Sequence, residues 1–201
     1  FPYTTLFRSF IANQYTVADG ERQRFIPAAY GIFGHGNVAG LGQALDEFND
    51  ELPFIQGRNE QAIAHAAIAF AKATRRQQAM AVTASIGPGA LNMVTAAGLA
   101  TVNRLPVLLL PGDIYATRRQ GPVLQQLENP GSPDISVNDA FRPVSRFFDR
   151  ITRPEQLLVS LPQAFRVLAN PVETGAVVIS LPQDIQSHAF DFPAEFFRPR
   201  D

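Results

Sequence analysis

The sequence contains no cysteine and no tryptophan, and only three of its 201 residues are histidine. Without cysteine, neither a disulfide nor a thiol nucleophile can form, and so few histidines argue against a zinc site. Any chemistry of this chain therefore has to come from carboxylates, backbone amides or a cofactor.

Excess charge of one sign and long apolar runs are also missing. The chain carries 17 basic and 18 acidic side chains, a formal net charge of -1, and Lys72 is its only lysine. Because the arginines are scattered, the sequence does not predict the concentrated positive surface that binds nucleic acid or an anionic membrane. No run approaches the roughly 18 apolar residues of a spanning helix, and no basic segment leads into a signal-like apolar run. We expect a cytoplasmic protein without nucleic-acid or membrane partners.

The length suits one domain with a core large enough to fold without disulfides. Residues 1–9 show neither helical periodicity nor a clear cap, so we expect them to be a scar of cloning or sequencing and not part of the fold. The domain is expected to span residues 10–201.

Short apolar runs alternate with longer helical patterns along the rest of the chain. The predicted strands are 30–33, 53–56, 79–84, 106–110, 145–149 and 176–181. The predicted helices are 10–17, 38–48, 60–74, 90–103, 138–142 and 154–168. This alternation predicts an α/β fold with a mostly parallel sheet of about six strands and helices on both faces. Residues 112–137 are predicted to form one long irregular segment.

Small residues gather on the predicted helix 90–103, where Ala96, Ala97, Gly98 and Ala100 allow close helix approach. Such a helix serves either a subunit interface or a dense core, and the sequence leaves both open.

A glycine-rich segment, GHGNVAGLG at 34–42, follows the first predicted strand of this alternation. A dinucleotide fingerprint needs G-x-G-x-x-G and an acid at the end of the next strand. Here the third glycine comes one residue late and the next strand ends on Gln56. The segment is therefore either a tight strand-to-helix turn or a ligand-facing turn, with His35 as its pocket residue.

A second turn, SIGPGALN at 85–92, joins a strand to a helix. Gly87, Pro88 and Gly89 set a rigid turn and leave the first helix amides free for an anion or a polar ligand. A purely structural turn is the alternative, and no P-loop pattern supports nucleotide hydrolysis.

Glu60 opens the next predicted helix, where a carboxylate either offsets the helix dipole or faces a ligand. His65 lies five residues on, about 140° around the helix, so the two cannot form a metal-binding pair on one face.

Five segments together carry a family resemblance over about residues 10–198. They are FGHGNVAGLGQA at 33–44, GRNEQ at 57–61, SIGPGA at 85–90, VNRLPVLLLPGD at 102–113 and FFDRITRPEQ at 147–156. The chain resembles the pyrimidine-binding domain of thiamine-diphosphate enzymes. Within that family it is most similar to the hydrolases of inositol catabolism that cleave a ring C–C bond of a cyclic dione.

The resemblance implies that Glu60 exchanges a proton with the aminopyrimidine ring of thiamine diphosphate and so activates the cofactor. It also implies that His35, Gly36 and Asn37 face the active site, and that residues 85–92 form the pyrimidine-side wall, with Gly87, Pro88 and Asn92 as cofactor contacts.

The family's Gly-Asp-Gly motif, which binds Mg²⁺ and the diphosphate, does not occur. We therefore expect a fragment that is inactive alone and contains no metal ligand. The resemblance implies that Mg²⁺ is bound by a missing domain and that the full-length chain forms a homodimer or homotetramer. An acetolactate-synthase-like carboligase, a decarboxylase and a non-catalytic ligand-binding or interface module remain the alternatives.

Overall fold

The structure is a computed structural model that describes residues 3–117, 121, 123–124, 127, 131–132 and 134–201. Its centre is a six-stranded sheet in the order β4-β3-β5-β6-β8-β7. The strands are β3 (Ala29–Gly31), β4 (Phe54–Gln56), β5 (Ala81–Ala84), β6 (Val107–Asp113), β7 (Phe147–Arg150) and β8 (Ala176–Pro182). Every neighbouring pair is parallel. The predicted α/β fold with a parallel sheet is confirmed.

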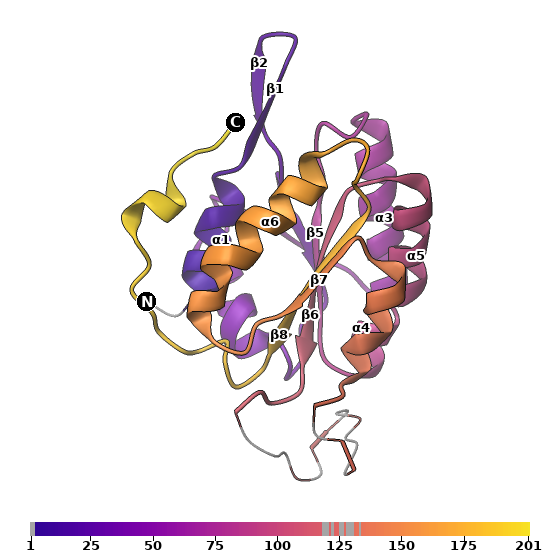
Figure 1. Cartoon of the computed structure of the whole chain (residues 1–201), viewed down its shortest axis with the longest axis vertical. Helices are drawn as coiled ribbons and strands as arrows, with labels where there is room; N and C mark the ends of the chain where they lie inside the picture. Colours follow the sequence, from indigo (N-terminus) through magenta and orange to yellow (C-terminus); the bar gives the residue numbers. More distant parts are fainter. Residues whose placement is uncertain (1–2, 118–120, 122, 125–126, 128–130, 133) are drawn as a thin grey trace.

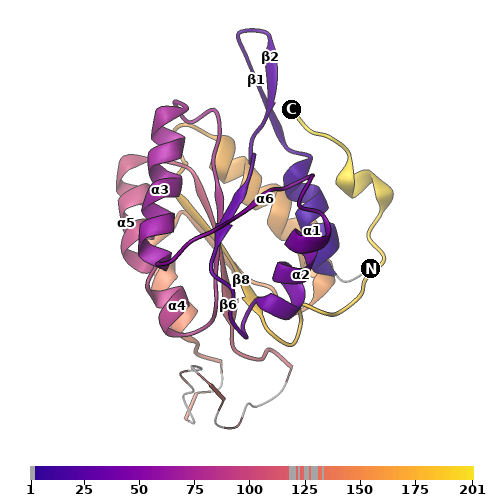
Figure 2. The same cartoon turned by 180° about the vertical axis from the view of Figure 1, so that it is seen from behind.

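Helices cover both faces of the sheet (Figures 1 and 2). One face carries α1 (Tyr3–Ala12), α2 (Gln43–Glu47), the π-helix η1 (Val38–Gly42) that precedes α2, and α6 (Leu157–Ala169). The other carries α3 (Glu60–Ala73), α4 (Pro88–Leu91), α5 (Val94–Asn103) and the 3-10 helix η2 (Val137–Val144). Two further 3-10 turns are η3 (Pro154–Gln156) and η4 (Ala194–Phe197). Among the described residues, no helix is long and apolar enough to cross a membrane.

The two faces of the sheet bury separate hydrophobic clusters. Leu108 and Leu110 of β6 belong to the cluster beneath α1, α2 and α6. Val107 and Leu109 belong to the cluster beneath α3 and α5. Successive side chains of a strand point to opposite faces, and a strand covered on both faces is therefore apolar throughout.

The small residues of α5 belong to the dense core. Ala96, Ala97 and Ala100 are fully buried in the cluster that α5 shares with α3. Of the two roles that the sequence left open, the structure places these three alanines in packing within the chain.

The start of the chain differs from the prediction. Helix α1 includes residues 3–9, for which we expected no regular structure, and Phe7 and Phe10 are fully buried. Phe7, Phe10 and Ile11 recur at the three- and four-residue spacing of one helix face, and this stripe packs into the core. That residues 1–9 are foreign to the natural protein stays a prediction.

The predicted helix 10–17 is wrong beyond Ala12. The chain there forms an antiparallel hairpin of β1 (Tyr15–Ala18) and β2 (Glu21–Arg24), which protrudes from the body (Figure 1). Asp19 and Gly20 form its turn with φ of 53° and 83°. Asp-Gly is a favoured pair for such a two-residue turn, so the signal was present in the sequence.

Several other predicted boundaries differ from the structure; the predicted helix 154–168, for example, begins with the 3-10 turn η3. The predicted helix 90–103 is divided, because α4 ends at Leu91 and α5 begins at Val94. The predicted irregular segment 112–137 is shortened at its start, because β6 continues to Asp113. Positions 118–120, 122, 125–126, 128–130 and 133 of that segment lie outside the described residues.

Arg104 ends α5 in the left-handed region, with φ 52° and ψ 49°. Glycine adopts this conformation without the steric cost that a Cβ atom brings. We expect Arg104→Gly to raise the free energy of unfolding by about 0.5–1 kcal/mol, measured by urea denaturation. The control is Ala66→Gly, at an exposed position within α3, which should lower it by about 1 kcal/mol. Destabilisation by both variants would show that Arg104 is not strained.

Candidate active site

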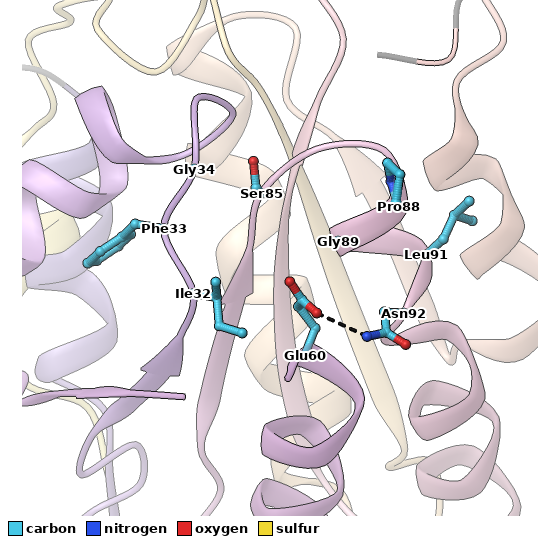
Figure 3. A pocket seen from close by; sticks show the side chains of 9 residues that line it. All are labelled: Ile32, Phe33, Gly34, Glu60, Ser85, Pro88, Gly89, Leu91 and Asn92. Carbon is cyan, nitrogen blue, oxygen red and sulfur yellow. Dashed lines mark hydrogen bonds between the residues drawn. The ribbon is translucent and has the colours of Figure 1, made fainter. Parts of the chain in front are cut away.

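A hollow opens at the carboxyl ends of β3 and β5. The chain leaves β3 toward β4 at the edge of the sheet, and α3 then returns it to β5 on the other side of β3. Open α/β sheets bind ligands where the strand order reverses in this way. The hollow has a volume of about 780 Å³ and is lined by Ile32, Phe33, Gly34, Glu60, Ser85, Pro88, Gly89, Leu91 and Asn92 (Figure 3).

Glu60 is the first residue of α3, and its half-buried carboxylate points into the hollow (Figure 3). The cap of α3 comes from Asn59, whose side-chain oxygen accepts a hydrogen bond from the Ala62 amide at 2.9 Å. Asn92 Nδ2 donates to Glu60 Oε2 at 3.0 Å. Asn59 caps α3, so the Glu60 side chain is not needed as the cap. Its direction into the hollow favours a contact with a ligand over a role limited to the helix dipole.

The turn between β5 and α4 lies directly against this carboxylate. A Cβ atom on Gly89 would lie 3.3 Å from Glu60 Oε1, so the glycine leaves room beside that oxygen. Gly87 has φ 63°, which favours glycine, and Pro88 begins α4. The Gly-Pro-Gly sequence therefore fixes the backbone of the turn and leaves space for the Glu60 carboxylate beside Gly89.

The turn after β3 is fixed by Asn37, which is almost fully buried. Its side-chain oxygen accepts from the Gly34 amide at 2.9 Å. Its Nδ2 donates to Ile32 O at 3.2 Å and to Thr83 Oγ1 at 3.0 Å. The Asn37 side chain thus ties the turn to β5.

Gly36 holds the same turn against the next strand end. Its amide donates to Ser85 Oγ at 3.3 Å, and its carbonyl accepts from Gln186 Nε2 at 2.7 Å. A Cβ atom on Gly36 would lie 2.8 Å from the Ile86 amide nitrogen. No other residue type fits there without moving the backbone.

The structure brings together three of the predicted site residues, because Glu60, Pro88 and Asn92 all line the hollow. Gly36, Asn37 and Gly87 shape the surrounding turns and are not among the lining residues. His35 is half-buried, and its Nε2 is buried without a hydrogen-bond partner in the described part of the chain. Cofactor contacts by all seven predicted residues stay predictions.

The sequence analysis did not include two of the lining residues, Ile32 and Phe33, which directly follow β3. Open α/β sheets bind ligands at the carboxyl ends of their strands, so the position of Ile32 and Phe33 at the end of a predicted strand could have indicated both residues.

Apart from Glu60, the described lining of the hollow contains no ionisable side chain. The described residues also include no group of three or more His, Cys, Asp or Glu side chains that could hold a metal ion. The hollow offers one carboxylate, one amide and one hydroxyl beside the apolar side chains of Ile32, Phe33, Pro88 and Leu91.

Asp184, just after β8, holds the segment that follows β6. Its carboxylate accepts from the amides of Ala116 and Thr117 at 2.9 and 3.0 Å, and from the Thr117 hydroxyl. Burial works to raise the pKa of Asp184, but these hydrogen bonds outweigh it and hold the pKa below its ordinary value of 3.8. A lowered pKa means that the contact is fully stabilising above pH 3.8 and is lost as the pH falls below it.

We therefore expect the amides of Ala116 and Thr117 to lose protection from hydrogen exchange as the solution is acidified below pH 3.8. In Asp184→Asn this pH dependence should flatten, since asparagine does not titrate. If the variant keeps the wild-type pH dependence, another group holds the segment.

Comparisons with known proteins agree with this geometry. Residues 26–135, more than half of the chain, match the family described as "Thiamine pyrophosphate enzyme, N-terminal TPP binding domain". The matched region includes β3, Glu60, the Gly-Pro-Gly turn and β6.

Among curated proteins, the chain is 59% identical over 191 residues to "3D-(3,5/4)-trihydroxycyclohexane-1,2-dione hydrolase" of Geobacillus thermodenitrificans (strain NG80-2). It is 58% identical over 191 residues to the protein of the same name from Bacillus thuringiensis (strain Al Hakam). Each alignment covers 95% of this chain and 30% of the relative, so the chain spans about a third of the length of these relatives. The family match and the position of Glu60 in the hollow lead to one conclusion: the chain belongs to the thiamine pyrophosphate enzymes, as their N-terminal TPP binding domain.

Proposed function

We propose that this chain is the cofactor-activating domain of a thiamine-diphosphate-dependent hydrolase that cleaves a ring C–C bond of trihydroxycyclohexane-1,2-dione. The observation that carries the proposal is the Glu60 carboxylate, which points into the hollow at the point where the strand order reverses. The identity of 57–59% to relatives that bear this hydrolase name supports the substrate.

The hollow suits the aminopyrimidine ring of thiamine diphosphate. Ile32, Pro88 and Leu91 provide apolar wall for a flat ring, and Glu60 provides a carboxylate for a ring nitrogen. The absence of a Cβ atom on Gly89 leaves space beside the carboxylate, where such a ring could approach. The residues present therefore fit this part of the cofactor.

In the proposed reaction, Glu60 moves a proton to and from the ring nitrogen in contact with it. When bound, thiamine diphosphate supplies the nucleophilic carbon and the electron sink that cleavage of a C–C bond next to a carbonyl requires.

The described lining has no cationic side chain that could pair with the diphosphate. We propose that the diphosphate and Mg²⁺ are bound outside this chain, by the remainder of a protein as long as its relatives. A homodimer or homotetramer of that protein, located in the cytoplasm, is part of the same proposal.

The test is a substrate comparison with the full-length protein that carries this domain. With thiamine diphosphate and Mg²⁺ present, we expect turnover of the cyclic dione and no comparable turnover of pyruvate. Preferential consumption of pyruvate would instead indicate an acetolactate-synthase-like carboligase or a decarboxylase. Failure to bind the cofactor would refute the proposed enzyme class.

A further inference from the structure

The hydrogen bond between Asn92 and Glu60 distinguishes the two oxygens of the carboxylate. Asn92 Nδ2 donates to Oε2 at 3.0 Å, while Oε1 is the oxygen nearest to Gly89 (Figure 3). Since a carboxylate can only accept, the amide nitrogen is the atom of Asn92 that faces it. A proton taken up by Glu60 therefore goes to Oε1 as long as Oε2 keeps its donor.

The fold holds Asn92 in place through the break between α4 and α5. Asn92 is the first residue after α4, and its backbone amide donates to the Pro88 carbonyl oxygen at 3.0 Å. Helix α5 begins only at Val94. Asn92 therefore keeps helical backbone angles, φ −64° and ψ −14°, at the end of α4 and lies where the two helices separate.

We propose that Asn92 is a positioning residue for the proton transfer, and that it acts through Glu60 and not by contact with the cofactor. By holding Oε2, it keeps the carboxylate turned into the hollow and leaves Oε1 as the oxygen that exchanges the proton. This inference rests on the proposed function. It assigns Asn92 a role that differs from the cofactor contact expected from the sequence.

Three substitutions in the full-length enzyme separate these roles. Asn92→Ala removes the donor, Asn92→Gln keeps an amide donor on a longer side chain, and Asn92→Asp replaces the donor with a second carboxylate. Glu60 is the only ionisable side chain in the described lining, so a new carboxylate at position 92 would have Glu60 as its one titratable neighbour there. Two carboxylates at hydrogen-bond distance do not readily ionise together.

The readouts are the exchange rate of the C2 proton of bound thiamine diphosphate, the dissociation constant of the cofactor, and the pH dependence of kcat/KM. For Asn92→Ala we expect exchange to slow about ten-fold, as for loss of one hydrogen bond to a charged group, with affinity changed less than about three-fold. Asn92→Gln should recover part of the rate. Asn92→Asp should move the acid limb of the pH profile upward by about one unit.

Two controls make the outcome decisive. When Asn92→Asp is added to Glu60→Gln, the pH profile should stay that of Glu60→Gln alone, because the carboxylate that would couple to the new carboxylate at position 92 is gone. Thr95→Ala, at an exposed position of α5, should behave as wild type in all three readouts and in thermal stability.

Parallel losses of cofactor affinity and exchange rate, with an unmoved pH profile, would overturn the positioning role in favour of a cofactor contact. Wild-type exchange in all Asn92 variants would overturn it as well. The proposed function fails separately, if Glu60→Gln itself leaves the exchange rate unchanged.

Discussion

Replacing Glu60 with glutamine in the full-length enzyme is expected to lower kcat for the cyclic dione by about 10²–10⁴-fold, the usual range for loss of a general acid–base group. Glutamine keeps the size and the hydrogen-bonding capacity of the side chain but cannot exchange a proton. The Asn92 contact can survive, because the glutamine side-chain oxygen still accepts. The measurement is steady-state kinetics at saturating cofactor.

The matched control is Glu21→Gln on the exposed hairpin, which contributes no residue to the lining of the hollow. It makes the same chemical change and should leave kcat unaltered. A Glu60→Gln enzyme with kcat near that of this control would contradict the role of Glu60.

The largest expected effect on stability comes from Asp113, which is fully buried at the end of β6. Its carboxylate accepts from Arg150 Nε at 2.9 Å, from Ser180 Oγ at 2.5 Å and from the Ile114 amide at 2.8 Å. Arg150 and Ser180 lie in β7 and β8, so this carboxylate connects the three strands. Removing Asp113 would leave the Arg150 guanidinium with the more distant Asp139 carboxylate, at 3.6 Å, and so with weaker compensation of its charge.

We therefore expect Asp113→Ala to lower the free energy of unfolding of the chain by about 3–5 kcal/mol, measured by urea denaturation. Asp46→Ala, which removes an exposed aspartate from α2, should change it by less than about 0.5 kcal/mol. Adding Arg150→Met to Asp113→Ala should recover part of the loss, because the weakly compensated cation is then gone. Purely additive losses would show that the two side chains are not coupled.

The sheet could be predicted from the sequence because its central strands are apolar throughout. Val107–Asp113 and Ala176–Pro182 are buried on both faces, and such runs alternating with helical patterns indicate a parallel sheet. The start of the helix over residues 3–12 was missed because residues 1–9 taken alone show no helical periodicity, and the stripe that begins at Phe7 is completed only by Phe10 and Ile11. The stripe formed by Phe7, Phe10 and Ile11 is visible in the sequence once those residues are included.

The site was predictable only in part. Glu60 and the Gly-Pro-Gly turn were candidates because of their places at helix and strand ends, and the family resemblance then implied their roles. The bond between Asn92 and Glu60 joins residues 32 positions apart. Such a contact depends on how α3 and α4 pack, which local sequence patterns do not specify. The same holds for Asn37, whose amide binds Thr83 on the neighbouring strand.

The most direct test of the central claim is the exchange of the C2 proton of thiamine diphosphate for deuterium, followed by NMR on the full-length enzyme. If Glu60 exchanges a proton with the bound cofactor, Glu60→Gln should bind thiamine diphosphate and slow this exchange by about 10²-fold or more. Exchange at the wild-type rate in a variant that still binds the cofactor would contradict the claim.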